Sequence, residues 1–135
     1  MNFKDTVFIT GFPGFIAGRL VEKLANAETQ FFLLVQKNFV DKAIKDVAVI
    51  AKKTNTPLDN YALVVGDITQ ENLGMSDADL EIICDQTTEV FHLAAIYDLE
   101  VEKDLASKVN VEGTKNVNEV VKKIKNLRRY NYVST

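Results

Sequence analysis

The chain has 135 residues, a length that suits a single domain with a substantial core. Its hydrophobic content of 47% and charged content of 26% are ordinary for a globular protein, and a net charge of −3 gives no reason to expect nucleic acid or an anionic membrane as a partner. A lone cysteine, Cys84, excludes an intrachain disulfide, and a lone histidine, His92, excludes a Cys/His metal cluster. No apolar run reaches membrane-spanning length and no signal peptide is visible, so we expect a cytoplasmic protein.

The first thirty residues predict a strand, a glycine turn and a helix. Residues 6–10 form a short apolar, β-branched run, and Gly11 and Gly14 follow before a helical pattern begins. Glycines let the backbone turn sharply and approach a ligand, and the free N–H groups at a helix start point at a phosphate. The sequence therefore predicts an anion-binding junction, and the alternative is a tight turn that holds no ligand.

The elements that follow alternate in type. Segments of strand length predict four further strands, at residues 31–35, 61–65, 89–93 and 129–133. The unbroken apolar run at 31–35 is typical of a strand buried on both faces, as in a parallel sheet. Helical spacing predicts three further helices, at residues 40–53, 76–85 and 102–125. We expect Ser76 to cap one helix, and Ile44 and Ala48 to belong to the apolar stripe of another. Gly113 lies on the inner stripe of the last helix, and we expect it to let two backbones approach each other closely.

This alternation predicts an α/β fold, a doubly wound parallel sheet of five strands in the order 3-2-1-4-5, within one domain spanning residues 1–135. A flavodoxin-like domain that binds no dinucleotide is an alternative, since it would place a different strand beside the first. The fifth strand would be an outer strand, and an open edge invites pairing with another copy of the chain, so a homo-oligomer is expected through that edge.

The spacing of the glycines departs from the common dinucleotide-binding pattern G-x-G-x-x-G. Thr10-Gly11-x-x-Gly14-x-x-Ala17 instead resembles the turn of the short-chain dehydrogenase/reductase superfamily, and the Phe15-Ile16 pair is similar to its extended branch. The resemblance covers essentially the whole chain and corresponds to the cofactor half of a family member. It implies an NAD(P)-binding Rossmann domain whose turn binds cofactor through Gly11, Phe12, Pro13, Gly14, Phe15 and Ile16.

The end of the second strand bears on the choice between NADP and NAD. NAD enzymes usually place an acid there for the ribose 2′-hydroxyl, whereas this chain has Gln36 and Lys37. Lys37, together with Arg19 in the first helix, can face a 2′-phosphate, because a cation attracts that group and a carboxylate repels it. We therefore expect NADP to be preferred and NAD to remain possible. If Lys37 is only a solvated surface lysine, either cofactor is open.

Two further strand ends resemble family segments. Gly66-Asp67-Ile68 follows the third strand, and the resemblance implies that Asp67 accepts a hydrogen bond from the adenine amino group while Ile68 packs on the ring. Asp in a turn after a strand is also common without any ligand. The segment that ends the fourth strand resembles the family's H-x-A-A run, in which small residues let the backbone lie along the ribose and nicotinamide; its cofactor-binding members are Leu93, Ala94 and Ala95.

The remaining candidates concern catalysis. We interpret His92 as a hydrogen-bonded core residue rather than a catalytic one, because a lone histidine at a buried strand end is more often structural. Asn110 lies in a segment that resembles the family's N-x-x-G-T-x-N, which implies that it faces the active site; the alternative is an interior residue satisfied by a neighbouring backbone group. By position, Thr135 matches the residue that polarises the substrate oxygen, with Ser134 as the second choice.

The family's proton-transfer pair, Tyr-x-x-x-Lys, does not occur in these 135 residues. We therefore expect the dinucleotide-binding portion of an oxidoreductase that acts on a carbonyl or alcohol substrate, with this chain alone binding dinucleotide weakly and catalysing nothing. The alternative is a non-catalytic sensor or interaction domain of Rossmann type. We expect no metal site, no membrane partner and no nucleic-acid partner. A basic cluster at 122–129 leaves nucleic-acid binding as a minor alternative.

Overall fold

The computed structural model describes residues 3–93 and 103–133. Its five strands form one parallel sheet in the order β3-β2-β1-β4-β5. Their bounds are β1 Asp5–Ile9, β2 Thr29–Val35, β3 Tyr61–Val65, β4 Glu89–Leu93 and β5 Arg129–Val133. The order confirms the predicted Rossmann topology and excludes the flavodoxin-like alternative, in which β3 would lie beside β1.

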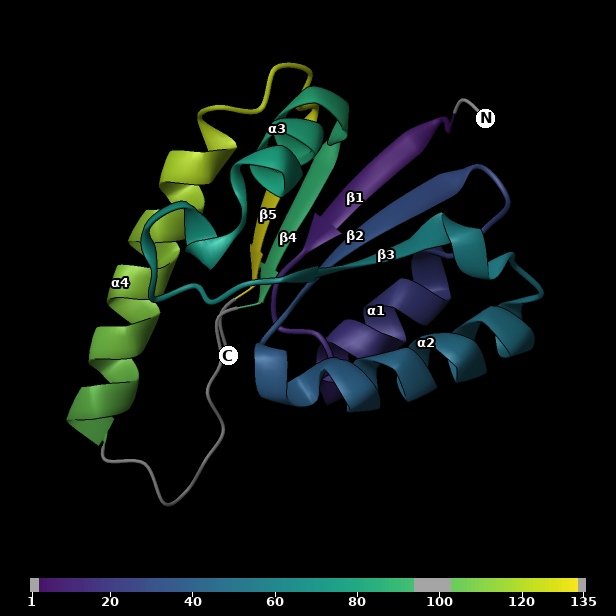
Figure 1. Ribbon diagram of the computed structural model, residues 1–135, viewed down its shortest axis with the longest axis horizontal. Coiled ribbons are helices and arrows are strands. Elements are labelled where there is room, and N and C mark those ends of the chain that lie inside the picture. The colour runs from purple at the N-terminus through teal and green to yellow at the C-terminus, as the bar shows by residue number, and fades with distance from the viewer. Residues whose placement is uncertain (1–2, 94–102, 134–135) are drawn as a thin grey trace.

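The helices cover the sheet from both sides (Figure 1). Four are α-helical and three are short 3₁₀ turns: α1 Phe15–Leu24, α2 Val40–Thr54, α3 Asp77–Gln86, α4 Lys103–Val121, η1 Lys37–Phe39, η2 Leu58–Asn60 and η3 Glu71–Gly74. Right-handed crossovers place α1 and α2 on one face and α3 and α4 on the other. The N-terminus of α1 therefore lies at the same end of the sheet as the carboxyl ends of the strands.

Each face of the sheet has its own apolar core. Phe31, Leu33 and Val35 of β2 point toward α1 and α2, whereas Phe32 and Leu34 point toward α3 and η3. All five of these residues are buried, which confirms that the unbroken apolar run of β2 marks a strand covered on both faces. Phe31 also stacks on Tyr61, its register partner in β3, with ring centroids 5.4 Å apart and planes 5° from parallel.

Two details of the predicted helices are wrong. In α2 the buried positions are Ala43, Val47, Ile50 and Ala51, and Ile44 is 53% exposed, because a residue one step from the buried stripe is rotated about 100° away from the sheet. Ala48 is likewise exposed.

The last helix ends at Val121 rather than at residue 125. The amide of Lys123 donates to the carbonyl of Val120 and that of Ile124 to Val121, so the chain tightens beyond the helix to a three-residue spacing. This tighter turn brings Ile124 into the core, where it is 8% exposed.

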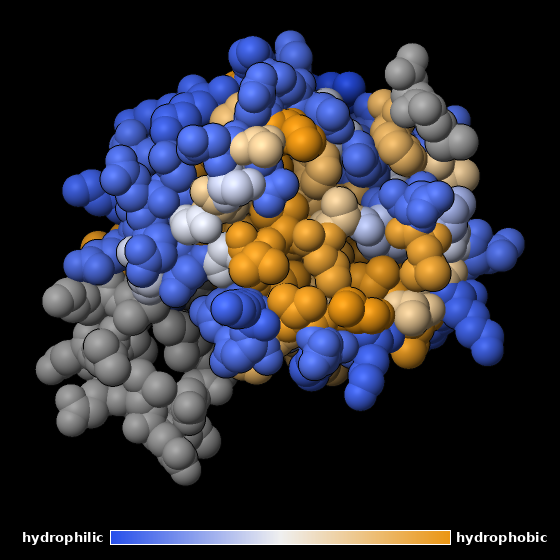
Figure 2. Space-filling view, in the orientation of Figure 1, coloured by the Kyte–Doolittle hydropathy of each residue, from blue (hydrophilic) through white to orange (hydrophobic). Residues whose placement is uncertain are grey.

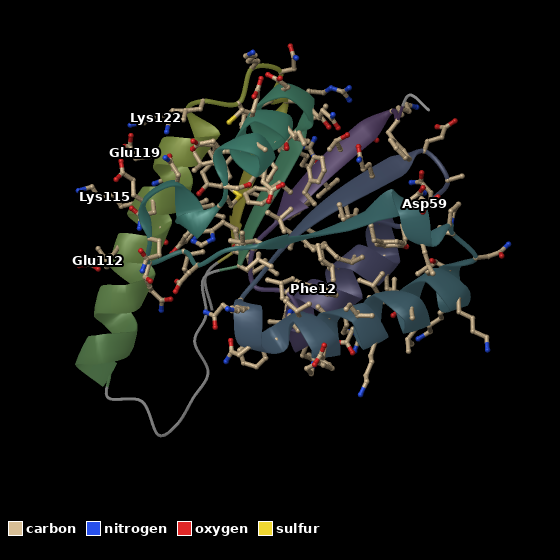
Figure 3. The ribbon with its side chains drawn as sticks, in the orientation of Figure 1. Phe12, Asp59, Glu112, Lys115, Glu119 and Lys122 are labelled. Atoms are coloured by element: carbon tan, nitrogen blue, oxygen red, sulfur yellow. The ribbon has the colours of Figure 1, made fainter. Side chains whose placement is uncertain are left out.

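The outer side of α4 is charged. Figure 3 shows Glu112, Lys115, Glu119 and Lys122 along the side of the helix that faces away from the sheet. The Lys122 ammonium lies 3.1 Å from the Glu119 carboxylate. Other members of the basic cluster also meet acids of this chain, since Lys125 pairs with Asp85 at 2.7 Å and Arg128 with Asp5 at 3.1 Å. Within the described parts of the chain, no helix combines the length and hydropathy needed to span a bilayer.

The two outer strands of the sheet are β3 and β5. Figure 2 shows an apolar patch at the centre of one face, over the region where β3 forms the edge of the sheet. Val65 of β3 is 48% exposed, and Leu58 just before it is 59% exposed. At the opposite edge, β5 is paired with β4 on its inner side. Association of copies through an edge stays a prediction.

Candidate functional site

The glycine turn between β1 and α1 is built for close approach of a ligand to the main chain. Gly11 has φ +90°, a conformation that L side chains rarely adopt, and a Cβ added there would lie 3.1 Å from the carbonyl oxygen of Leu93. A Cβ on Gly14 would lie 2.7 Å from the carbonyl oxygen of Gly11. Both positions therefore need glycine, for conformation at the first and for space at the second.

The first turn of α1 leaves its amides available. Gly14 is the N-cap and offers no side chain to the helix, and the first helical bond runs from the Gly18 amide to the Gly14 carbonyl at 2.8 Å. No acidic residue lies in the first turn, so no carboxylate of that turn repels an anion there. The amides of Phe15, Ile16 and Ala17 thus meet the geometric requirement for binding a pyrophosphate.

The side chains predicted to bind cofactor in this turn have different surroundings. Phe12 is 4% exposed and lies between the sheet and the helices α1 and α2 (Figure 3), so only its backbone is available to a ligand. Phe15 is 77% exposed, and the guanidinium carbon of Arg19 lies 5.4 Å from its ring centroid. Ile16 is 44% exposed, and the half-buried Pro13 follows Phe12 through a cis peptide bond.

The end of β2 presents polar, exposed groups beside the turn. Gln36 and Lys37 are both exposed, and Lys37 begins the short helix η1. The segment from Gln36 to Phe39 contains no acid, and Asp41 in the first turn of α2 is the next one along the chain. A cation and a neutral amide thus follow this strand, as the sequence shows.

The segment after β3 is held in one conformation by the turn that follows it. A Cβ on Gly66 would overlap the carbonyl oxygen of Leu73 and come within 2.5 Å of Leu34 Cδ1. The amide of Asp67 donates to that same Leu73 carbonyl at 2.7 Å. Oδ1 of Asp67 accepts hydrogen bonds from the amide and the hydroxyl of Thr69, at 2.9 and 2.7 Å, which leaves Oδ2 without an assigned bond in the described chain.

Three residues in the left-handed region shape this supporting turn. Asn72, Leu73 and Gly74 have φ of 52°, 57° and 63°. A leucine at positive φ is disfavoured, but Leu73 is completely buried, so its apolar contacts offset the backbone strain. No pattern in the sequence predicts this turn, because backbone preference and burial act in opposite directions there.

Helix α4 fixes the same segment from the opposite side. Ile68 packs so closely on Gly113 that a Cβ added to the glycine would lie 2.6 Å from Ile68 Cδ1. The side-chain amide of Asn116 donates to the Ile68 carbonyl at 2.8 Å. A close approach is present at Gly113, but its partner is the side chain of Ile68 and not, as predicted, another backbone. Asn116 is a supporting residue that the sequence interpretation did not assign, although its spacing of three from Gly113 puts both on one helix face.

His92 is completely buried and hydrogen-bonded through both ring nitrogens, which confirms its assignment to the core. Nδ1 lies 2.7 Å from the hydroxyl of Thr10 and Nε2 lies 3.0 Å from that of Thr114. Burial disfavours the charged ring and lowers the pKa of His92 from 6.5 to about 4. The ring therefore stays neutral at physiological pH and links β1, β4 and α4.

We expect stability to fall between pH 6.5 and 4 because of this ring. Above pH 6.5 the histidine is neutral in both states; below it the unfolded chain takes up a proton that the folded chain resists, until the folded pKa of His92 is passed near 4. The full loss is about 3 kcal/mol, since one pKa unit corresponds to about 1.4 kcal/mol. Urea unfolding at pH 7 and pH 5 measures the part of this loss that falls above pH 5, which is about 2 kcal/mol. His92→Asn should lose this share of the pH dependence, and an unchanged slope in that variant would contradict the assignment.

The catalytic predictions fall partly outside the described residues. Oδ1 of Asn110 is buried and has no hydrogen-bond partner in the described chain. The alternative prediction, that a neighbouring backbone group donates a hydrogen bond to Asn110, is therefore not observed for this oxygen. Asn110 precedes Thr114 by one turn of α4, which places both near the end of β4. Leu93 is half-buried beside Gly11. Ala94, Ala95, Ser134 and Thr135 lie outside the described residues, and their roles stay predictions.

The predicted site residues that the structure describes lie together at the carboxyl ends of the strands. The glycine turn follows β1, Lys37 follows β2, Asp67 and Ile68 follow β3, and Leu93 ends β4. Open α/β sheets bind ligands at the carboxyl ends of their strands, at the point where the strand order reverses. In the described ranges, 3–93 and 103–133, no group of three or more His, Cys, Asp or Glu residues is placed to hold a metal ion.

Comparison with known proteins gives a consistent set of relatives. A fatty acyl-CoA reductase of Drosophila melanogaster, wat, is 29% identical over 147 residues that include the whole of this chain and 28% of the relative. Fatty acyl-CoA reductase 1 of Homo sapiens is 27% identical and aligns with 96% of this chain and 27% of its own length. The chain thus spans just over a quarter of the length of these relatives.

Solved structures show the same fold. The terminal R domain of the myxalamid biosynthetic pathway superimposes with a TM-score of 0.76 at 21% identity, over 97% of this chain and 34% of that one. The reductase domain of a nonribosomal peptide synthetase from Mycobacterium tuberculosis gives a TM-score of 0.77 at 20% identity, over 97% and 33%. The NAD-binding family described as "Male sterility protein" matches residues 9–135. Together with the glycine turn, this match confirms the resemblance to extended short-chain reductases, and the chain belongs to that NAD-binding family.

Proposed function

We propose that this chain is the NADP(H)-preferring dinucleotide-binding part of a reductase whose substrate is a fatty acyl thioester. The observation that carries the nucleotide assignment is the pair Gly11 and Gly14, where the backbone leaves no room for a side chain and the first amides of α1 are uncapped. A Cβ at either glycine would meet the protein's own backbone, so the two glycines let the turn close tightly in front of these amides, which is the arrangement expected for a bound pyrophosphate.

The described residues would hold the dinucleotide at two strand ends, those of β1 and β3. The glycine turn would hold the pyrophosphate through main-chain amides, and the Oδ2 atom of Asp67 is the acceptor left for the adenine amino group. Ile68, held by Gly113 and Asn116, offers an apolar surface for the ring. Bound in this way, a reduced nicotinamide supplies the hydride for reduction of a carbonyl.

The substrate class comes from the relatives. Several curated relatives are fatty acyl-CoA reductases, and an acyl thioester presents a carbonyl carbon that can accept a hydride. The proton-transfer pair would be supplied by residues other than these 135. Asn110, with its buried unpartnered oxygen, is the described residue best placed to orient a polar group near the end of β4. Cytoplasmic location stays a prediction.

The preference for NADP rests on charge at the end of β2. Lys37 is exposed at the start of η1, no acid lies between Gln36 and Phe39, and Arg19 lies on α1 with its guanidinium stacked on Phe15. A 2′-phosphate beside this segment would meet a lysine and would meet no carboxylate.

Lys37→Asp should reverse the cofactor preference. We expect the Kd for NADPH to rise about tenfold, because the change from attraction to repulsion weakens binding by about 1.4 kcal/mol in total, while the Kd for NADH changes little or improves. Isothermal titration with both nucleotides measures this. Lys52→Asp, at the far end of α2, makes the same charge change away from the site and should leave both constants unchanged. An unaltered NADPH affinity in the first variant would contradict the role of Lys37.

A further inference from the structure

The buried ring of His92 lies at the centre of a hydrogen-bonded relay whose polarity is fixed by its neighbours. The amide of Leu93 donates to the hydroxyl oxygen of Thr10 at 3.2 Å. The hydroxyl proton of Thr10 then needs an acceptor, and the one that the described residues provide is Nδ1 of His92, at 2.7 Å. Nδ1 is therefore unprotonated.

The other ring nitrogen follows from this assignment. A neutral imidazole carries one proton, so Nε2 holds it and donates to the hydroxyl of Thr114 at 3.0 Å. The ring is neutral because burial lowers the pKa of His92 to about 4. Of the two possible tautomers, the one with its proton on Nε2 is thus selected by the amide of Leu93, acting through Thr10.

The relay ends at the glycine turn. Gly11 packs directly against Leu93, since a Cβ on the glycine would lie 3.1 Å from the Leu93 carbonyl oxygen and 3.2 Å from its Cβ. The amide of Thr10 also donates to the Phe91 carbonyl at 3.1 Å. The position of Thr10 relative to the end of β4 therefore sets the position of the turn.

We propose that His92 is a positioning residue for the dinucleotide, which acts by accepting a hydrogen bond from the Thr10 hydroxyl at Nδ1 and so holds Leu93 and Gly11 in register, without contacting the ligand. This inference rests on the proposed nucleotide-binding function. The two ring nitrogens then have different roles: the hydrogen bond between Nδ1 and Thr10 supports the glycine turn, and the hydrogen bond between Nε2 and Thr114 anchors β4 to α4.

Two replacements separate these tasks. The amide of asparagine reaches the place of Nδ1, and that of glutamine reaches the place of Nε2. His92→Asn should keep the bond from Thr10 and bind NADPH within about threefold of the original chain. His92→Gln should lose that bond and raise the Kd about tenfold. Because both remove an imidazole from the core, both should lower the melting temperature, so a purely structural role predicts equal effects on affinity.

A second pair of variants keeps the test valid if either histidine variant fails to fold. Thr10→Ser retains the hydroxyl and should preserve affinity, whereas Thr10→Val removes it and should weaken NADPH binding about tenfold. Nitrogen-15 chemical shifts of the ring should show Nε2 protonated and Nδ1 unprotonated in the full 135-residue chain. Equal affinities for the asparagine and glutamine variants, or the opposite tautomer, would overturn this inference alone. An original chain that binds neither NADPH nor NADH would overturn the proposed function and this inference with it.

Discussion

Replacing Gly66 by alanine is expected to lower the free energy of unfolding by about 3 kcal/mol, the upper end of the usual cost of overpacking. The added methyl group would overlap the carbonyl oxygen of Leu73 and lie 2.5 Å from Leu34 Cδ1. Neither neighbour can move freely, because the Leu73 carbonyl also accepts the Asp67 amide and Leu34 is buried in the core. Equilibrium urea unfolding measures the change.

Gly18→Ala is the matched control for this variant. Gly18 lies within α1, and a Cβ added there would have no atom within 4 Å. The same substitution should therefore raise the free energy of unfolding by about 0.5–1 kcal/mol, the usual difference between alanine and glycine inside a helix. Equal effects in the two variants would show that the turn around Leu73 is looser than described.

The second large effect concerns binding. Gly14→Ala is expected to raise the Kd for NADPH about 100-fold, because a Cβ 2.7 Å from the Gly11 carbonyl oxygen forces the turn open. The amides at the start of α1 then no longer converge, and two charge-assisted hydrogen bonds to the pyrophosphate, each worth about 1.5 kcal/mol, correspond to that factor. Isothermal titration at a temperature where the variant is folded measures it.

A destabilised variant with an intact turn provides the comparison. Ile83 in α3 is 1% exposed in the core on the far side of the sheet from α1, and Ile83→Val should cost about 1 kcal/mol of stability. Its NADPH affinity should equal that of the original chain. If Gly14→Ala bound NADPH within threefold of the original chain, the pyrophosphate would not be held by this turn.

The fold could be predicted because its signals are local and repeated. The unbroken apolar run of β2 and the glycine spacing after β1 can each be recognised from residues that are neighbours in the sequence. The alternation of strands and helices then limits the possible topologies to a few. The N-cap at Ser76 is of the same kind, and its side chain accepts the Asp79 amide at 3.2 Å as expected. The end of α4 was missed because a tighter turn continues the apolar spacing as far as Ile124.

The site was predictable as a set of strand ends but not as a set of contacts. The sequence does not show that Phe12 turns into the core while Phe15 faces outward beneath Arg19, since each phenylalanine directly follows a glycine of the same turn. Nor does it show that Asn116 supports Ile68, because that bond joins residues 48 positions apart. Leu73 at positive φ contradicts local preference, and tertiary burial decides its conformation.

Gly113, Thr114 and Asn116 lie within a single turn of α4, yet they contact two different strand ends, those of β3 and β4. A mutation that rotates this helix would therefore displace both strand ends together. During divergence such positions tolerate change only in concert, so we expect substitutions at 113, 114 and 116 to be coupled to those at 68 and 92. Alignment columns from a wider set of relatives would reveal that covariation.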